Sequence, residues 1–323
     1  MSRNILRDGD QLMLPWWDGG ECVCDSEGKC VPKFPSLETS LPPRLMNVNG
    51  TCGRRASADG DNQRIISFSL YGDDPGYWSQ LSDSLSKIKK LYPGWKVWLY
   101  TEPRGKSGYL CPLLKKHSHL RVCDVSNLPN PLFNITQVLP TMWRIVPLGD
   151  PTVDVLLVRD TDMMFSEREQ TAVMDWLSSG KTFHVMRDHP NHVVQVLAGM
   201  WGARWDVQEE KNSTSATVTG PRRADLINIR NKMLKLAYLI DQKMLDQEIM
   251  KRVLWPEMVG FMVSHDSFYC QVFKSGWKPW PMQRKNGDFV GNAWYRKEFA
   301  NNKMKVMCPA ACRPPDHQDW QYC

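Results

Sequence analysis

The sequence predicts an α/β fold with a mostly parallel central sheet and flanking helices. Two observations carry this prediction. Strand-like and helix-like segments alternate from residue 64 to residue 125, and an apolar strand at residues 155–158 ends in Arg159-Asp160-Thr161-Asp162. An order of strand, helix, strand produces parallel pairing with helices on both faces of the sheet. With 323 residues, of which 42% are hydrophobic, the chain is long enough to bury one large core.

Local patterns predict the elements of the first half. Residues 64–72 form a short β-rich run that ends at a Gly-Asp-Asp-Pro turn. Apolar residues then recur at spacings of three and four from Trp78 to Tyr92, which predicts an amphipathic helix ended by Pro93-Gly94. A strand at 96–100, a helical turn at 109–116 and a strand at 120–125 complete the alternation.

The second half continues the pattern. Ser166 and Glu169 are spaced as a capping box, in which the Ser oxygen accepts a backbone N–H and the Glu side chain reaches back. This box predicts a helix that runs to Ser178 and is closed by Gly180. Two glycines within residues 198–202 indicate a close approach of the backbone to another group. The remaining expected elements are a loop at 126–137, a short helix at 141–147, strands at 183–187 and 259–263, a polar loop at 212–220, and helices at 226–240 and from 245 to near 255.

Composition divides the chain into three parts. We expect residues 1–62 to form a loosely structured, cysteine-containing stem or linker, residues 63–300 to form the α/β domain, and residues 301–323 to form a cysteine-containing tail. In the stem, Cys22, Cys24 and Cys30, with Cys52 further on, form either half of a zinc knuckle or a small disulfide-stapled loop. The disulfide interpretation is favoured, because no Cys-x-x-Cys pair and no nearby His completes tetrahedral ligation.

Charge and cysteine content limit which partners and which cellular compartment we expect. The net charge of +6 suits an anionic small ligand, and without a Lys/Arg run longer than two residues we expect no nucleic-acid partner. Ten cysteines and sequons at Asn49, Asn134 and Asn212 favour an oxidising compartment, either the lumen of the secretory pathway or the outside of the cell. No apolar signal region or membrane-length segment is present in this chain. Either the chain is a fragment whose anchor or signal lies upstream, which we favour, or the inference about the compartment is wrong.

Asp160 and Asp162 are the central candidates for a functional site. Residues i and i+2 of an extended chain point to the same side, so both carboxylates aim out of the carboxyl end of a core strand, where α/β sheets bind ligands. A divalent metal that carries phosphate oxygens would relieve their repulsion. His265, which follows another predicted strand, is a candidate third ligand, and an imidazole favours Mn²⁺ over Mg²⁺. The alternatives are an acidic turn after a strand and a structural histidine.

An ordered set of motifs resembles the nucleotide-sugar glycosyltransferases of the GT-A fold, a Rossmann-like arrangement. The resemblance covers residues 64–292 and is greatest to the glycogenin-like, family 8 type and to an uncharacterised group of bacterial and eukaryotic relatives. The motifs are Tyr71-Gly72, Trp143-Arg144, Arg159-Asp160-Thr161-Asp162, Met186-Arg187-Asp188-His189-Pro190, Ala198-Gly199, Gly199-Met200-Trp201-Gly202, Asp246-Gln247 and His265-Asp266-Ser267.

The resemblance implies a role for each motif. Asp160, Asp162 and His265 would hold Mn²⁺, with Mg²⁺ as a second possibility, and the donor would be a nucleotide-diphosphate sugar, with a UDP-sugar favoured. The residues implied at the donor are Tyr71 and Gly72 at the base, Arg144 at the sugar or phosphate, Gly199 where the backbone approaches the sugar, and Asp246 and Gln247 at the reacting face of the sugar. The implied enzyme is a hexosyltransferase of the Golgi or endoplasmic reticulum that retains configuration and acts on an unknown glycan, protein or lipid acceptor.

Two departures from the family pattern stand out. Leu197 occupies the place where the family has Asn before Ala-Gly, and the segment containing Lys278 is one residue shorter than the family's phosphate element. Lys278 is therefore only a possible diphosphate contact. Asp188-His189 is either an acceptor-side base or a turn that contacts the backbone.

Two other classes of protein compete with this interpretation. The first is a non-catalytic, glycosylated binding module on the same fold, which the loss of Asn at Leu197 motivates. The second is a phosphatase of the Asp-x-Asp-x-Thr type, but Met164 stands where that motif has Thr or Val. No Gly-rich nucleotide loop, Gly-x-Ser-x-Gly or His-Glu-x-x-His motif supports a further class of enzyme.

Overall fold

The computed structural model describes residues 7–8, 11–12, 14–34, 48–206, 220–240, 242, 244–293 and 304–323. The sequon at Asn212 and the predicted loop at 212–219 lie outside the described residues. Among the described sequons, Asn49 and Asn134 are exposed. Within the described part of the chain, no helix has the length and apolar character that a membrane span requires.

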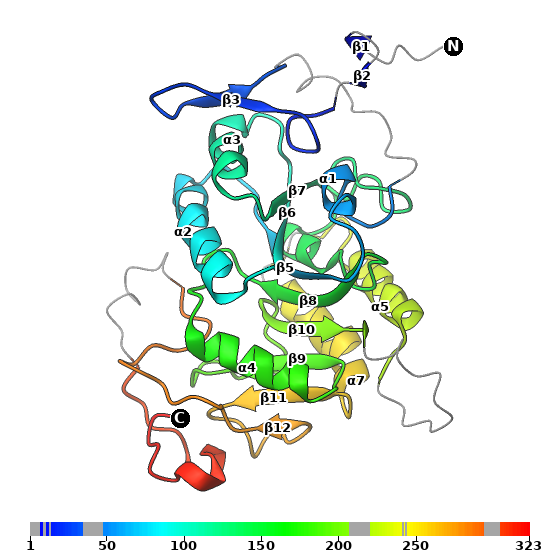
Figure 1. Cartoon of the computed structure of the whole chain (residues 1–323). Coiled ribbons are helices and arrows are strands. Elements are labelled where there is room, and N and C mark those ends of the chain that lie inside the picture. Colours follow the sequence, from blue (N-terminus) through cyan, green and yellow to red (C-terminus); the bar gives the residue numbers. More distant parts are fainter. Residues whose placement is uncertain are drawn as a thin grey trace.

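An eight-stranded sheet forms the centre of the molecule (Figure 1). Its strand order is β12-β11-β9-β10-β8-β5-β6-β7, and β10 alone among these eight runs antiparallel to its neighbours. The predicted α/β class with a mostly parallel sheet is confirmed. The strands are β5 Gln63–Ser69, β6 Lys96–Thr101, β7 Leu120–Asp124, β8 Val153–Arg159, β9 Phe183–Arg187, β10 Met200–Arg204, β11 Met262–Asp266 and β12 Trp277–Lys278. Short hairpins pair β1 Arg7–Asp8 with β2 Gln11–Leu12 and β3 Cys22–Cys24 with β4 Cys30–Pro32.

Helices cover both faces of the sheet (Figure 1). Successive strand residues alternate between two apolar cores, as the pleat requires: Ile65 belongs to one core and Ile66 to the other. One core is closed by α2 Pro75–Leu91, α3 Ser107–Lys116 and α4 Glu167–Ser178. The other is closed by the 3₁₀ turn Pro140–Ile145, α5 Arg223–Leu236, α6 Leu245–Ile249 and α7 Trp255–Met258, with α1 Arg54–Ser57 beside them.

The helix termini show how local sequence sets these elements. The Asp74 carboxylate accepts the backbone N–H of Gly76 at 2.8 Å, and Pro75 occupies the first helical position of α2. At α4, the Ser166 hydroxyl accepts the N–H of Glu169 at 3.3 Å, as predicted. The Glu169 carboxylate does not reach back, because it accepts a bond from Arg159 at 2.7 Å inside the core. Only half of the predicted capping box therefore forms.

Two strands differ from the sequence prediction. β10 was not expected as a strand, because Gly202 weakens the strand pattern that the buried Trp201 and Ala203 would otherwise show. β11 begins at Met262, later than the predicted start at 259, because helical structure continues to Met258 and Gly260 forms a turn with φ of +87°. His265 consequently lies inside β11, and the prediction that it follows the strand is wrong.

All ten cysteines form disulfides, so the zinc-knuckle alternative is wrong for Cys22, Cys24 and Cys30. Two of the disulfides, Cys22–Cys111 and Cys52–Cys123, join described residues of the segment 1–62 to the domain, and Trp16 and Trp17 are buried in the core shared with α2 and α3. The pairs are Cys22–Cys111, Cys24–Cys30, Cys52–Cys123, Cys270–Cys312 and Cys308–Cys323.

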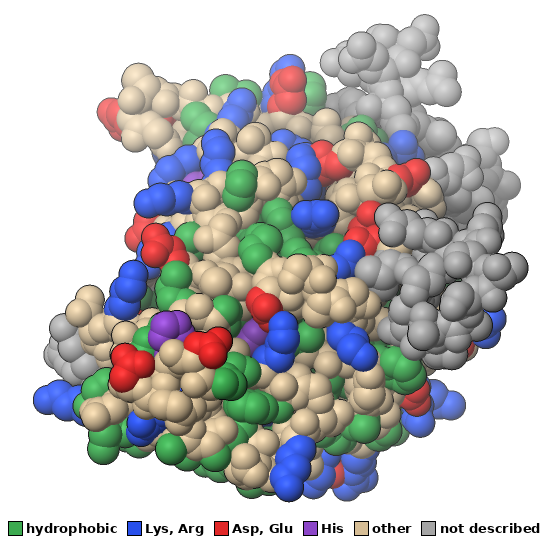
Figure 2. All heavy atoms as spheres, turned by 60° about the horizontal axis from the view of Figure 1, so that its bottom comes forward, with side chains coloured by type: hydrophobic (Ala, Val, Ile, Leu, Met, Phe, Trp, Pro, Cys, Tyr) green, Lys and Arg blue, Asp and Glu red, His purple; other side chains and the backbone are tan. Residues whose placement is uncertain are grey.

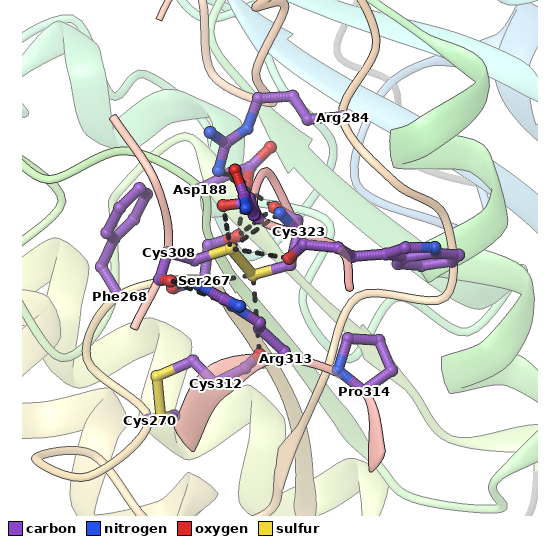
Figure 3. The surroundings of a disulfide bond; sticks show 12 residues. Asp188, Ser267, Phe268, Cys270, Arg284, Cys308, Cys312, Arg313, Pro314 and Cys323 are labelled. Atoms are coloured by element: carbon purple, nitrogen blue, oxygen red, sulfur yellow. Dashed lines mark hydrogen bonds and ion pairs between the residues drawn. A yellow bond between two sulfur atoms is a disulfide. The ribbon is translucent and has the colours of Figure 1, made fainter. Parts of the chain in front are cut away.

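The C-terminal segment is anchored through Asp188 (Figure 3). The buried Asp188 carboxylate accepts bonds from Arg168 at 2.7 Å and from Ser267 at 2.6 Å, and it pairs with Arg284 at 3.3 Å. Arg168 and Arg284 also donate to the backbone carbonyl of Cys323. Burial raises the pKa of Asp188, but the two guanidinium groups outweigh burial and hold the pKa below its usual value.

On the face shown in Figure 2, basic and acidic side chains are interspersed, so the positive charge is spread there rather than gathered.

Candidate functional site

The strand order places a ligand site between β5 and β8. From β5 the chain proceeds to β6 and β7 on one side, and β8 then adds on the other side of β5. In open α/β sheets, ligands bind outside the carboxyl ends of the strands at such a reversal of strand order. Tyr71 follows the carboxyl end of β5, and Asp160 follows that of β8. The predicted location of the site thus coincides with the topological switch point.

Two adjacent cavities meet at this edge of the sheet. The first compartment, of about 600 Å³, lies on the side of Tyr71 and Tyr77. The second compartment, of about 380 Å³, lies on the side of His189, His192 and Asn292. Their shared lining consists of Arg144, Asp160, Asp162, Met244 and Asp246. A ligand with two chemically different halves can therefore occupy both compartments and cross the acidic pair.

Arg144 links the acidic groups of the shared wall. Its guanidinium donates from Nη1 to Oδ1 of Asp160 and from Nη2 to Oδ2 of Asp246, the latter at 3.4 Å. The Arg144 side chain is buried, whereas about half of the Asp160 side chain is exposed to the cavity. The 3₁₀ turn that carries Arg144 packs its Met142 and Ile145 into the core, which fixes where the guanidinium emerges.

Gly199 makes room for Asp160. A Cβ added at residue 199 would lie 2.0 Å from Oδ2 of Asp160 and 2.3 Å from Cγ of the same carboxylate. Real atoms do not approach so closely, so only glycine leaves the carboxylate where it is. The close approach predicted for this glycine is present, and its neighbour in the structure is Asp160.

Asp246 and Gln247 have different tasks. The Gln247 amide donates to the carbonyl of Val196 at 3.1 Å and accepts the N–H of Ala198 at 3.2 Å. Both ends of the amide are thus committed to the segment before β10, so Gln247 positions that segment. Asp246 accepts the N–H of Gln247 at 2.9 Å and keeps its carboxylate on the wall that the two cavities share.

Tyr71 and Gly72 occupy the turn after β5. The Tyr71 ring lines the first compartment and meets Trp143 edge to face, with ring centroids 6.1 Å apart. Burial raises the pKa of the Tyr71 phenol, with Arg144 acting in the opposite direction. Gly72 adopts a φ of +73°, and its carbonyl accepts the indole N–H of Trp78 at 3.2 Å. Gly72 is outside the lining of the compartment and shapes the turn that presents Tyr71.

His265 and Lys278 do not join the acidic pair. His265 lies on β11, which β9 and β10 separate from β8, and its ring is fully buried. Its Nδ1 lies 2.8 Å from Nε2 of His184, and its Nε2 lies 3.2 Å from the Asp175 carboxylate. Lys278 pairs with the same carboxylate at 2.8 Å. The predictions of a third metal ligand at His265 and a diphosphate contact at Lys278 are therefore wrong in this geometry.

The second compartment contains His189, which the sequence singled out together with Asp188, and two residues that it did not single out, His192 and Asn292. Asp188 is committed to the tail network, which makes the interpretation of Asp188 as a base wrong, whereas His189 lines the cavity. His192 and Asn292 line it too. A His-x-x-His spacing after β9 is a weak signal for the two imidazoles. Asn292 comes from a C-terminal segment without any pattern, and a backbone bond to Met164 at 2.8 Å and the bridge between Met163 and Ala293 bring it to the site.

Comparisons with known proteins add little beyond the fold. No protein-family model matches the chain, and no curated protein matches it. Among solved structures it is similar to a glycosyltransferase involved in glycosylation of the major capsid protein of PBCV-1, with a TM-score of 0.35, 11% identity, and coverage of 63% of this chain and 81% of that chain. It is also similar to a mycobacterial protein, with a TM-score of 0.33, 12% identity, and coverage of 65% and 67%. Both TM-scores are low, so any function has to be argued from this chain's own residues.

Proposed function

We propose that the protein is a metal-dependent glycosyltransferase that uses a nucleotide-diphosphate sugar. One observation carries the proposal: Asp160 and Asp162 stand on the wall shared by two cavities at the switch point of the sheet. A nucleoside would occupy the first compartment, with Tyr71 available to contact the base, and a UDP-sugar is the favoured donor. The diphosphate would then cross the acidic pair, and the sugar would enter the second compartment.

The residues present fit a divalent cation that is bound together with the diphosphate. Asp160 and Asp162 offer carboxylate oxygens, the ligands that hard cations prefer, and waters and phosphate oxygens complete such sites. Within the described residues, no cluster of three or more His, Cys, Asp or Glu side chains could hold a metal by itself. With His265 elsewhere, the imidazole argument for Mn²⁺ falls away, and Mg²⁺ and Mn²⁺ suit the oxygen ligands equally. When bound, the cation neutralises charge on the departing diphosphate.

The chain's own residues supply the remaining chemistry. Cleavage of the sugar–phosphate bond leaves negative charge on the diphosphate, and the Arg144 guanidinium is placed to stabilise that charge where it develops. The sugar centre becomes oxocarbenium-like, and the Asp246 carboxylate stands on the wall beside it. Gln247 acts by holding residues 196–198 against this wall. Retention of configuration and transfer of a hexose follow the family resemblance and belong to the proposal.

A binding module on the same fold is the second candidate function. The five disulfides are compatible with a secreted or lumenal protein of either kind, and the lumen of the Golgi or endoplasmic reticulum is the compartment that we propose. The two functions differ in turnover. A non-catalytic module binds a sugar nucleotide without consuming it, whereas a transferase hydrolyses its donor slowly when no acceptor is present.

A screen of sugar nucleotides for hydrolysis, with Mg²⁺, with Mn²⁺ and with chelator, tests the proposal. We expect cation-dependent release of the nucleoside diphosphate from at least one donor and a loss of about 100-fold or more in Asp162→Asn, because a neutral amide is a weaker ligand for a cation whose charge stabilisation is worth several kcal/mol. Asp316→Asn, an exposed carboxylate in the C-terminal segment, is the matched control and should keep full activity. Equal activity in chelator, or in Asp162→Asn, would show that the site is misassigned.

A further inference from the structure

Asn292 holds a buried acceptor without a donor in the wall of the second compartment. The residue is 8% exposed, it lines the cavity, and its buried Oδ1 accepts no hydrogen bond from the described residues. An unpaired buried oxygen costs free energy, and most such groups in folded proteins are paired. An acceptor that stays unpaired in a cavity wall fits a ligand that brings a donor.

His189 and His192 present the opposite group to the same cavity. The backbone N–H of Asn191 donates to Nδ1 of His189 at 3.0 Å, and that of Asp188 donates to Nδ1 of His192 at 3.1 Å. A neutral imidazole whose Nδ1 accepts a bond carries its proton on Nε2. Neither Nε2 has a hydrogen-bond partner among the described residues. Each ring therefore offers an unused N–H donor.

Packing keeps the two rings in place and uncharged. The His189 ring lies 4.5 Å from that of Phe289 and 5.6 Å from that of His192, measured between centroids. Burial lowers the pKa of both imidazoles, and that of His192 falls to about 4. Both rings are thus neutral at pH 7. Because each Nδ1 is occupied and each Nε2 carries a proton, His189 is a donor here, and the interpretation of it as an acceptor-side base loses its support.

We propose that the second compartment binds the hydroxyl groups of a sugar ring, with His189 and His192 donating through Nε2–H and Asn292 accepting through Oδ1. A hydroxyl both donates and accepts, so it satisfies all three groups, whereas an ionised phosphate has no proton for Asn292. This inference rests on the proposed function and deepens it by naming the side chains that hold the sugar in the second compartment. Two sugars have this chemistry, the one on the donor and the one of an acceptor glycan, and the binding experiment separates them.

The tautomers can be measured without any ligand. In protein labelled with ¹⁵N-histidine, long-range ¹H–¹⁵N spectra at pH 7 distinguish Nε2–H, Nδ1–H and doubly protonated rings, and the spectra of His189→Asn and His192→Asn assign the signals. We expect the Nε2–H form for both residues. An Nδ1–H or a charged ring at either position would overturn the inference, whatever the outcome of the activity screen.

Binding distinguishes the sugar from the nucleotide. Asparagine keeps an acceptor for the N–H of Asn191 but lacks the Nε2–H donor, whereas glutamine places an amide N–H near the ε position. Calorimetry with UDP and with a panel of UDP-sugars should show that His189→Asn and Asn292→Leu lose about three- to tenfold in affinity for the UDP-sugar, one hydrogen bond each. Affinity for UDP should stay within about twofold of wild type on the same scale, and His189→Gln should recover part of the loss.

One more measurement tests whether the bound sugar is that of the donor or that of an acceptor. Methyl hexosides are titrated into protein saturated with UDP, and the Nε2 protons of His189 and His192 are observed. Equal losses for UDP and UDP-sugar would overturn the inference, because the residues would then act on the nucleotide or on the whole site. If no sugar nucleotide binds the wild-type protein, the proposed function fails. The hexoside titration alone then tests whether the second compartment binds a sugar. Shifts of both Nε2 protons that disappear in Asn292→Leu assign the site to the sugar of an acceptor. Selective loss of UDP-sugar affinity with unchanged protons assigns it to the donor sugar, and unchanged protons without that selective loss overturn the inference.

Discussion

At the scale of single residues, Gly199 determines whether the Asp160 carboxylate can occupy its place. Replacement by Ala puts a Cβ 2.0 Å from Oδ2 of Asp160. The Asp160 side chain is the mobile partner in this clash, and it must turn away from the cavity wall. We expect Gly199→Ala to fold with a loss of stability of no more than about 1 kcal/mol, because a side-chain rotation of this kind costs on that order. Affinity for the nucleotide in the presence of Mg²⁺ should fall at least about tenfold.

Calorimetry and thermal unfolding measure the two effects of Gly199→Ala separately. Gly108→Ala is the control, because a Cβ at Gly108 meets open space within α3. This change should leave nucleotide affinity unaltered and add up to about 1 kcal/mol of stability, since Ala is the better helix former. Unchanged nucleotide affinity in Gly199→Ala would mean that the position of Asp160 is irrelevant to binding.

At the scale of secondary structure, the segment before β10 depends on Gln247. Its amide forms two hydrogen bonds to the backbone of residues 196–198, and Gln247→Met removes both while keeping a similar volume. We expect a loss of about 1–2 kcal/mol in unfolding free energy, from two partly exposed bonds. KM for the donor should rise several-fold with a smaller change in kcat. Steady-state kinetics with the donor found in the screen measures KM and kcat for the variant and for wild type.

Glu248→Gln is the control for Gln247→Met. Glu248 forms an exposed ion pair with Arg252, which lies in the π-helical segment Met250–Leu254 that continues α6, and such pairs contribute about 0.5 kcal/mol or less. Its loss should leave both kinetic constants unchanged. A fall in kcat at constant KM in Gln247→Met would instead indicate that Gln247 acts on the reacting sugar, as the family resemblance implies.

Elements with a strong local pattern were predictable, and those that depend on remote contacts were not. β8 and its acidic pair follow from four consecutive apolar residues and two carboxylates, all within one short stretch. β10 was missed because its glycines are explained by remote contacts. Gly199 leaves room for Asp160, and Gly202 leaves room for Leu157 and Trp176, all of which lie far away in the sequence. The end of α7 shifted β11 by three residues, and this shift moved His265 from the predicted edge into the sheet.

The same division holds for the candidate site. Tyr71, Arg144 and Asp246 reach the predicted cleft because each lies at the end of, or on, an element whose position the topology sets. Asn292 could not be foreseen, because its position depends on a backbone bond to Met164 and on the anchoring of its neighbour Val290 by Asp188 at 2.9 Å. Contacts of this kind leave no periodic trace in the sequence.

At the scale of the whole molecule, buried histidines should make stability depend on pH. Burial lowers the pKa of His117 from 6.5 to about 4, helped by the nearby charge of His119, and it also lowers the pKa values of His184 and His265. The unfolded chain therefore binds protons first as the pH falls. The contribution is fully present above pH 6.5 and is lost as the pH falls from 6.5 towards 4. For His117 alone the loss is about 2 kcal/mol at pH 5.

His117→Gln isolates this effect, because glutamine can still bond to the hydroxyl of Ser82, which lies 3.2 Å from Nε2 of His117, but cannot titrate. The unfolding free energy from denaturant curves at pH 7 and pH 5 should fall less in the variant than in wild type, by about 1–2 kcal/mol. His317→Gln, at an exposed ring that stacks on Trp320, is the control and should reproduce the fall of wild type.

Loss of stability only below pH 4 would instead assign acid sensitivity to carboxylates such as Asp175. The pKa of Asp175 is held at about 2 by its hydrogen bond from His265 and by the ammonium group of Lys278, with burial opposing both. In that case wild type and His117→Gln would run parallel between pH 7 and pH 5, and the histidines would contribute nothing to the acid response of this fold.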